Sequence, residues 1–244
     1  MNVKIGKRMF GKVKELVKRK LYSRLGVAYN SYGIPFPLFK HIQGCSNLTL
    51  IDVGAHDGLF TQAVDRYCGV TKAILVEPLP HKVAALQKVF NSQNYYIYQC
   101  VAASKVETID FEINDFEPTS SILKIKRNIP ELASISLGDS KVIKCQAKTL
   151  DELVKESQLD YIDLIKIDVQ GTEHLVIEGG RETLKKTRMI WTEVSFKALY
   201  EGSSNFMDIY HLLNQLDFKL TELVPGFRSP SGELLQGDAL FVKL

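Results

Sequence analysis

The chain has 244 residues, of which 45% are hydrophobic and 24% charged, and its formal net charge is +3 at pH 7. This length suits one large α/β domain with a short extension better than two full domains. No apolar run reaches the roughly 20 residues that span a bilayer, and the N-terminal stretch lacks the apolar core of a signal peptide. A cytoplasmic location is therefore the expectation.

Positive charge is concentrated in the first twenty residues, where eight side chains are Lys or Arg and one is acidic. Apolar residues recur at helical spacing between Val13 and Leu25, which predicts a basic amphipathic helix. Such a helix either packs one face on the domain or makes a peripheral contact with an anionic membrane through residues 1–25. Nucleic acid is not expected as a partner, because no recognisable RNA or DNA module follows. With the Gly- and Pro-containing linker after it, this helix forms a predicted first region, residues 1–47.

From residue 48 onward, short apolar runs alternate with segments of helical periodicity. Residues 115–140 interrupt this alternation, because they are polar and turn-rich, and they are predicted to form an insertion or a lid over the site. The predicted strands are 48–54, 72–78, 95–103, 107–114, 142–150, 161–169, 188–195, 218–225 and 238–244, and the predicted helices are 58–68, 81–91, 149–157, 173–186 and 204–216.

Strands that alternate with helices predict an α/β fold with a doubly wound, mostly parallel sheet. The last two strands can form a hairpin, which would add an antiparallel strand at the edge of the sheet. In such sheets, ligands bind beyond the carboxyl ends of the strands. The functional residues are therefore expected where the strands end.

The first strand ends in the sequence Asp52-Val53-Gly54-Ala55-His56-Asp57-Gly58. Gly54 allows a tight turn, and Gly58 allows the next helix to begin close to the strand. The amino end of that helix offers free backbone amides to a polar ligand. A dinucleotide fingerprint has a second glycine where this chain has Ala55, which weighs against an NAD site.

The second strand ends in Glu77 and Pro78. A carboxylate at this position can accept hydrogen bonds from both hydroxyls of a ribose, and the proline ends the strand. Together with the glycine loop, Glu77 predicts a cofactor that contains a nucleoside.

Several stretches of the chain resemble the FkbM family of S-adenosylmethionine-dependent methyltransferases. The order DxGxxxG and then an acid on the second strand is the pattern of class I methyltransferases. LIDVGAHDGLFT, ILVEPLP and LIKIDVQGTEHLVIEGG, followed by WTEV, look like the FkbM family. The resemblance covers about residues 48–243 and implies a Rossmann-like class I methyltransferase domain over 48–244. Gln170 is a departure, because the family usually has Glu there.

This resemblance implies S-adenosylmethionine as the cofactor and places its contacts at the ends of the first strands. The implied cofactor contacts are Asp52, Gly54, Ala55, Asp57 and Gly58 on the methionine and ribose side, Glu77 and Pro78 at the ribose, Val101 and Ala102 near the adenine, and Ser121 in a loop where the family often carries serine.

Methyl transfer to a hydroxyl requires an aligned acceptor and removal of its proton. Asp168 ends the apolar run LIKI, and Glu193 is an acid within the apolar strand WTEVS, where burial of a charge needs a reason. We hypothesise that Asp168 and Glu193 frame the acceptor hydroxyl, with His174 as the alternative base. Asp168 could instead cap a helix or bind a divalent ion through oxygen, although no dense ligand cluster predicts a metal site.

The leading prediction is therefore an O-methyltransferase that uses S-adenosylmethionine. The FkbM resemblance implies a hydroxyl of a sugar, glycan, glycolipid or secondary metabolite as the acceptor, which is a small-molecule, glycan or lipid-linked partner. One alternative is a nucleotide-dependent oxidoreductase, against which the absent GxGxxG counts. The other is a non-catalytic interaction protein that retains the fold. Three carboxylates at strand ends, Asp52, Glu77 and Asp168, weigh against that loss of activity.

Overall fold

The computed structural model describes residues 30, 32–127, 129–132 and 137–244. The basic helix expected in residues 1–25 lies outside these ranges, so this helix and its membrane contact stay predictions. Within the same ranges, no helix is long and apolar enough to cross a membrane. Helix α2 (Phe36–Ile42) buries Leu38 and Ile42 completely, so the core already includes residues before the predicted domain boundary at residue 48.

Among the described residues, seven strands form the large sheet. Their spatial order is β3 (Tyr95–Tyr98), β2 (Val70–Val76), β1 (Leu48–Val53), β7 (Ile162–Ile167), β8 (Thr187–Ser195), β10 (Gln236–Lys243) and β9 (Phe218–Pro225). β10 is antiparallel to β8 and β9, whereas the pairs from β3 to β8 are parallel. The predicted mostly parallel sheet with an antiparallel C-terminal strand is confirmed. That strand lies inside the sheet, however, and β9 forms the edge in its place.

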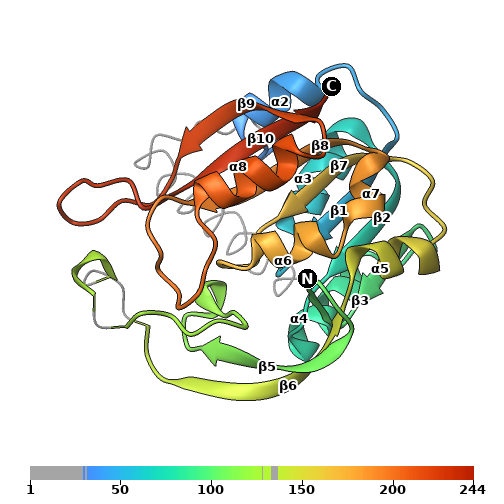
Figure 1. Cartoon of the computed structure of the whole chain (residues 1–244). Coiled ribbons are helices and arrows are strands. Elements are labelled where there is room, and N and C mark those ends of the chain that lie inside the picture. The colour runs from blue at the N-terminus through green and yellow to red at the C-terminus, as the bar shows by residue number, and fades with distance from the viewer. Residues whose placement is uncertain (1–29, 31, 128, 133–136) are drawn as a thin grey trace, which may run out of the picture.

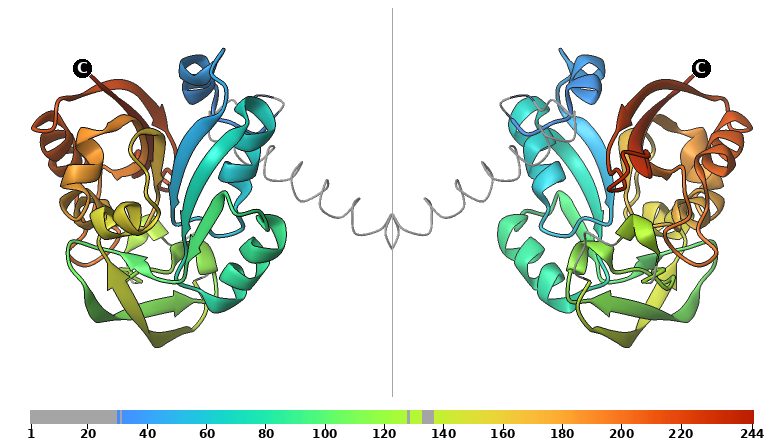
Figure 2. Two further views of the ribbon diagram at one scale, coloured as in Figure 1. Left: turned by 90° about the vertical axis from the view of Figure 1, so that its right-hand side faces the viewer. Right: turned by 90° about the vertical axis from the view of Figure 1, so that its left-hand side faces the viewer.

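Helices cover both faces of this sheet (Figures 1 and 2). Neighbouring residues along a strand point to opposite faces, so Ile51 and Ile165 pack on one face and Leu50 and Leu164 on the other. The first face is covered by α5 (Leu150–Glu156), α6 (Glu173–Glu178), α7 (Arg181–Lys185) and α8 (Phe206–Asn214), and the second by α2, α3 (Leu59–Cys68) and α4 (Pro80–Val89). The doubly wound α/β fold predicted from the alternation of elements is confirmed.

The helix predicted over residues 173–186 is instead two helices, α6 and α7, separated by Gly179 and Gly180. A Cβ on Gly179 would lie 2.1 Å from the carbonyl oxygen of Ala103. Only glycine allows this approach of the two backbones. The break between α6 and α7 therefore coincides with a tertiary contact of Gly179 with Ala103. The helical periodicity of the sequence does not reveal such a contact.

The strand predicted over residues 95–103 is also divided. Its second part, β4 (Val101–Ala102), leaves the large sheet and pairs with β6 (Ser140–Lys148), which in turn pairs with β5 (Glu107–Asn114). This small sheet lies below the large one in Figure 1. Hydrophobic pattern identifies such strands but does not say to which sheet they belong.

Residues 115–127, here called the bridging segment, follow β5 and contact both α4 and the loop after β8. At one end, the carboxylate of Glu117 lies 3.0 Å from Nε2 of His81 and 3.2 Å from Nζ of Lys82, at the start of α4. At the other end, the Lys126 amide donates to the carbonyl of Leu199 in the loop after β8. The bridging segment thus connects the start of α4 with the loop after β8. Its function as a lid stays a prediction.

Candidate active site

The order of the strands reverses beside β1, which pairs with β2 on one side and β7 on the other. The loops that leave β1 and β7 therefore lie next to each other, where doubly wound folds bind ligands. The Asp168 amide donates to the carbonyl of Val53 at 3.1 Å, and Nζ of Lys166 donates to the carbonyl of Gly54 at 2.7 Å. The predicted cofactor loop and the predicted reacting carboxylate are thus in direct contact.

Gly54 is required by this contact. Its φ of +77° belongs to the left-handed region, and a Cβ would lie 2.0 Å from the carbonyl oxygen of Asp168. Gly54→Ala should therefore lower the free energy of unfolding by about 3 kcal/mol or more, since the backbones must separate.

The matched control is Gly202→Ala, at φ +74° with no atom within 4 Å of the added Cβ. It carries only the conformational cost of about 1–2 kcal/mol. Urea denaturation of both variants measures the difference. Equal losses would contradict the close approach of the Gly54 and Asp168 loops.

Glu77, at the end of β2, is only 3% exposed, and two backbone amides fix its orientation. The His56 amide donates to Oε2 and the Leu79 amide to Oε1, both at 2.9 Å. Burial raises the pKa of Glu77, while these hydrogen bonds and the charges of Lys166 and Lys82 oppose the rise. Each oxygen can accept a further hydrogen bond. The carboxylate is thus held in one orientation, as recognition of a diol requires.

Asp52 lies beneath the loop and has no exposed surface. Its Oδ2 accepts a hydrogen bond from Oγ1 of Thr61 at 2.7 Å, and Nζ of Lys166 lies 3.5 Å from Oδ1. Charge-assisted hydrogen bonds of this kind fix a side chain firmly. Asp52 therefore supports the loop from the core side, on residues of α3 and β7.

Asp57 and Val101, two further predicted cofactor contacts, lie near the turn that follows Glu77. Asp57 pairs with Nζ of Lys82 at 2.8 Å. Val101 and Ala102 are buried on β4, and Val101 packs in one apolar cluster with Leu79. Asp57 thus lies in the loop after β1, and Val101 and Ala102 make up β4.

Ser121 lies instead beside the loop that carries Asp168. It is buried, and its Oγ donates to the carbonyl of Gln170 at 2.9 Å. The structure thus places the predicted cofactor serine against the loop after β7. Any contact of Ser121 with the cofactor stays a prediction.

The structure brings Asp168 and Glu193 together through an amide. Nε2 of Gln170 donates to Oδ1 of Asp168 at 2.9 Å and to Oε2 of Glu193 at 3.2 Å. Gln236 on β10 also donates to Oε2 of Glu193, at 2.9 Å. The side chain of Asp168 is 42% exposed, and Nζ of Lys166 lies 3.4 Å from its Oδ2. The carboxylate of Asp168 is therefore partly open to a ligand.

Further acids surround this pair. Asp238 is the cross-strand partner of Glu193 in the β8–β10 register. The pKa of Glu193 is raised well above its usual value, first by burial and then by the charges of Asp168, Glu173 and Asp238. The charge of Lys166 opposes this rise. Burial likewise raises the pKa of Asp238 to about 7. Burial lowers the pKa of Lys166, but its ion pairs with Asp168 and Asp52 outweigh that and raise it. Lys166 is thus a cation that several acids share.

The buried Glu173 predicts a pH dependence of stability. Burial raises its pKa from 4.5 to about 7 although the amides of Val169 and Gly171 donate to Oε1. A folded-state pKa above the unfolded value gives stability that is complete below pH 4.5 and is lost as pH rises through about 7. Glu173→Gln keeps the acceptor oxygen and removes the charge. It should gain on the order of 1–3 kcal/mol over the natural chain at pH 8 and little at pH 4.5. Urea denaturation at both pH values measures this, and an equal effect at both would contradict it.

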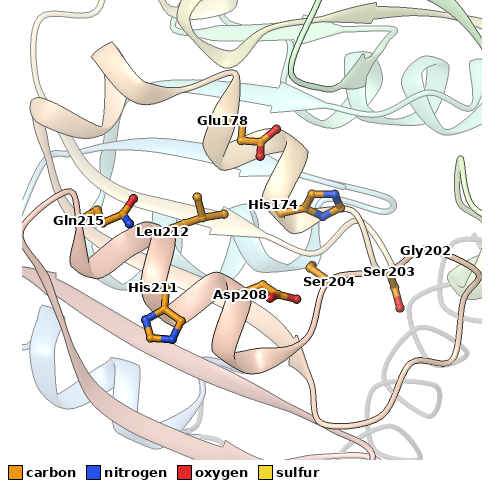
Figure 3. A pocket seen from close by; sticks show the side chains of 9 residues that line it. All are labelled: His174, Glu178, Gly202, Ser203, Ser204, Asp208, His211, Leu212 and Gln215. Atoms are coloured by element: carbon orange, nitrogen blue, oxygen red, sulfur yellow. The ribbon is translucent and has the colours of Figure 1, made fainter.

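His174, the alternative base, forms no hydrogen bond or ion pair with Asp168 or Glu193 among the described residues and lines a cavity of its own. This cavity, of about 400 Å³, lies between α6 and α8, and Glu178, Ser204 and Asp208 also line it (Figure 3). Burial lowers the pKa of its imidazole, against the charges of Glu178 and Asp208. Asp168 and Glu193 are not among the described residues that line this cavity, so a role of His174 as the base stays a prediction. A group of three or more His, Cys, Asp or Glu side chains suited to a metal ion is absent from the described ranges.

Comparisons with known proteins identify the family of this chain. The sequence profile of the methyltransferase FkbM domain matches residues 52–220. The 2-O-methyltransferase NoeI of Sinorhizobium fredii is 30% identical over 199 residues, which cover 78% of this chain and 77% of that protein.

Two solved structures are similar in fold. A protein of Listeria monocytogenes, predicted to be an S-adenosylmethionine-dependent methyltransferase, matches with a TM-score of 0.50 at 7% identity over 84% of this chain and 97% of its own. The methyltransferase FkbM of Methylobacillus flagellatus matches with a TM-score of 0.49 at 14% identity, over 80% of this chain and 43% of its own. From the profile match and the 30% identical relative, this chain belongs to the FkbM methyltransferase family and is an S-adenosylmethionine-dependent methyltransferase.

Proposed function

We propose that the enzyme methylates a hydroxyl of a sugar, in a glycan, a glycolipid or a smaller metabolite. The observation that carries this proposal is the partly exposed Asp168 carboxylate, which the amide of Gln170 links to Glu193 and which adjoins the Gly54 loop. The 30% identical relative is a 2-O-methyltransferase, which supports oxygen as the accepting atom. The resemblance to FkbM proteins supports a sugar-bearing acceptor.

The residues at the ends of β1 and β2 fit S-adenosylmethionine. Gly54 has no side chain to cover the loop backbone, and Glu77 presents a carboxylate already oriented by two amides. Glu77 would accept hydrogen bonds from the ribose hydroxyls with Pro78 beside it, Gly54 to Gly58 would line the methionine side, and Val101 and Ala102 would line the adenine side. When bound, S-adenosylmethionine supplies a methyl group on a positively charged sulfur, and its transfer leaves S-adenosylhomocysteine.

Asp168 is the general base in this proposal. Its carboxylate accepts the proton of the acceptor hydroxyl while that oxygen forms its bond to the methyl carbon. The ion pair with Lys166 and the hydrogen bond from Gln170 fix the carboxylate before the reaction. Glu193, whose pKa burial and the neighbouring acids raise well above its usual value, lies beside Asp168 and helps to frame the acceptor hydroxyl.

Asp168 can serve as a base or as a ligand of a divalent ion, and chelation separates these two functions. If Asp168 is the base, turnover of the full chain in EDTA should equal turnover in untreated buffer. Loss of turnover in EDTA, with recovery on adding magnesium or manganese, would replace the base with a bound ion.

The cofactor and the reaction class are tested together by calorimetry and product analysis. S-adenosylhomocysteine should bind the full chain, whereas NAD should not, because the loop has Ala55 where a dinucleotide site has glycine. S-adenosylhomocysteine should then form from S-adenosylmethionine only when an acceptor with sugar hydroxyls is added. Binding of NAD without binding of S-adenosylhomocysteine would favour a nucleotide-dependent oxidoreductase. Cofactor binding without product over a broad saccharide panel would contradict the proposed acceptor.

A further inference from the structure

The cavity between α6 and α8 has no part in the cofactor loop or in the acid pair. Its volume of about 400 Å³ lies within the range of about 300–1,000 Å³ that is usual for ligand sites. Helices α6 and α8 form its two walls, and the loop before α8 lies at one end (Figure 3). The side chains that matter here are His174 and Glu178 from α6, Ser204 from the loop, and Asp208, His211 and Leu212 from α8.

Two polar atoms at this cavity are buried without a partner. Ser204 is only 7% exposed, and among the described residues neither its Oγ nor Nδ1 of His174 has a hydrogen-bond partner. A buried polar atom without a hydrogen bond costs free energy, so native proteins seldom leave one unpaired without a reason. Rotation about χ1 can turn a serine hydroxyl in another direction. A ligand in the cavity would therefore give Ser204 and His174 the partners that the described chain does not supply.

The charge of the lining restricts which ligand fits. Glu178 and Asp208 are carboxylates, and none of the described lining residues is Lys or Arg. The two carboxylates repel phosphate and other anions. The described ranges also contain no group of three or more His, Cys, Asp or Glu side chains suited to a metal ion. The lining therefore favours an uncharged polar ligand.

Sugar hydroxyls match these groups. A hydroxyl donates one hydrogen bond and accepts others, carboxylates accept, and a serine hydroxyl does both. Burial lowers the pKa of His174, against the charges of Glu178 and Asp208, so the imidazole is neutral at pH 7 and offers one donor and one acceptor. Leu212 adds an apolar surface for the C–H groups of a sugar ring. The cavity thus has the hydrogen-bonding groups and the size for a saccharide residue.

The cavity also adjoins the loop that carries Asp168. The amide of Ser204 donates to the carbonyl of Gly171 at 3.2 Å. His174 directly follows Glu173, whose Oε1 accepts a hydrogen bond from the amide of Gly171 at 3.2 Å. The part of the cavity that His174 and Ser204 form is therefore attached to the loop after β7.

We propose that this cavity is a second sugar-binding subsite for the acceptor, and that it holds a sugar residue next to the one that is methylated at Asp168. Binding energy from this remote sugar residue would then help to position the reacting hydroxyl. The acceptor would accordingly contain at least two sugar residues. This proposal rests on the proposed function, in which the acceptor carries sugar hydroxyls.

The histidine side chains report binding to this subsite without any turnover. The chain has five histidines, whose NMR signals in the isotope-labelled full chain can be assigned with single His→Gln variants. The probes are disaccharides built from the common hexoses and deoxyhexoses. We expect at least one of them to shift the signals of His174 and His211. His41, on α2 at the other face of the sheet, is the internal control and should not respond.

Glu178→Ala tests whether the subsite serves turnover. Glu178 is exposed on α6, and its removal should weaken binding of the disaccharide about tenfold, as expected for a hydrogen bond to a charged group. The loss should appear in KM of the methylated disaccharide and not in kcat. In the natural chain, KM should be lower for this disaccharide than for its reacting sugar alone, and Glu178→Ala should remove most of that difference. Asn214→Ala, exposed on α8, is the matched control and should keep the natural KM.

Histidine signals that respond to no disaccharide would overturn the proposal. Because this titration uses the natural chain, it decides the question even if Glu178→Ala does not fold. A response of the same signals to magnesium chloride and to no saccharide would also overturn it, in favour of a cation site.

Two further outcomes separate this proposal from the proposed function. If saccharides are methylated by the natural chain and not by Asp168→Asn, while Glu178→Ala keeps the natural KM, only the subsite is wrong. If disaccharides shift the signals of His174 and His211 but receive no methyl group, the saccharide site stands and the proposed reaction is wrong.

Discussion

Replacing Asp168 with asparagine should lower kcat by about 10²–10⁴-fold, the usual contribution of a general base. Asparagine has nearly the same shape and preserves the backbone hydrogen bond from residue 168 to Val53. It cannot accept a proton from the acceptor at neutral pH. Steady-state rates at saturating S-adenosylmethionine and acceptor measure the effect.

Affinity for S-adenosylhomocysteine should be unchanged in this variant, since Glu77 and the Gly54 loop retain their contacts. Asp160→Asn, an exposed acid before β7, is the matched control and should keep the natural rate. A decrease in cofactor affinity that accounts for the lost turnover would show that Asp168 supports the cofactor loop instead of accepting the proton. Full turnover would remove Asp168 from the reaction.

Replacing Glu77 with glutamine should weaken S-adenosylhomocysteine binding by about 10- to 100-fold. A hydrogen bond to a charged group contributes about 1.5–3 kcal/mol, and about 1.4 kcal/mol corresponds to a factor of ten. Glutamine also places a donating nitrogen against the amide of His56 or Leu79, because both carboxylate oxygens already accept from these amides. Calorimetry with the purified chain measures the loss.

A pH titration tests the same assignment. The charged form of Glu77 accepts both amide hydrogen bonds, and burial raises its pKa. Affinity for S-adenosylhomocysteine should therefore fall as pH decreases through this raised pKa, and Glu77→Gln should remove that dependence. Glu107→Gln, at the partly exposed start of β5, is the control. Equal affinity of Glu77→Gln and the natural chain would place the ribose elsewhere.

Sequence alone predicted the sheet and much of the site, because both rest on local signals. Strands that end in Gly54, Glu77 and Asp168 point to the carboxyl edge of a doubly wound sheet, where residues distant in the chain meet. The contact between Gly54 and Asp168 is the structural result of this rule. The acid Glu193 stood out for a similar reason, since an apolar strand seldom buries a charge without purpose.

The other residues of the candidate site depend on the register of paired strands and on tertiary contacts. Lys166 lies inside an apolar strand, and this anomaly could have marked it as part of the site. Asp238 opposite Glu193 follows only from the pairing of β10 with β8, and no local pattern predicts that β10 inserts beside β8. Tyr200, whose hydroxyl donates to Oε1 of Gln170, lies in a loop after β8. Hydrophobic periodicity does not predict the course of that loop. His174 differs from these acids, because its residue type suggested catalysis while helix α6 places it in the cavity beside α8.

The most direct test of the central claim is to identify the methylated atom. The full chain is incubated with methyl-deuterated S-adenosylmethionine and a panel of saccharides and glycolipids, and the products are analysed by mass spectrometry and NMR. We predict one labelled methyl group on a sugar oxygen, formed by the natural chain and not by Asp168→Asn. A label on nitrogen, carbon or sulfur, or equal labelling by Asp168→Asn, would contradict the proposed O-methyl transfer at Asp168.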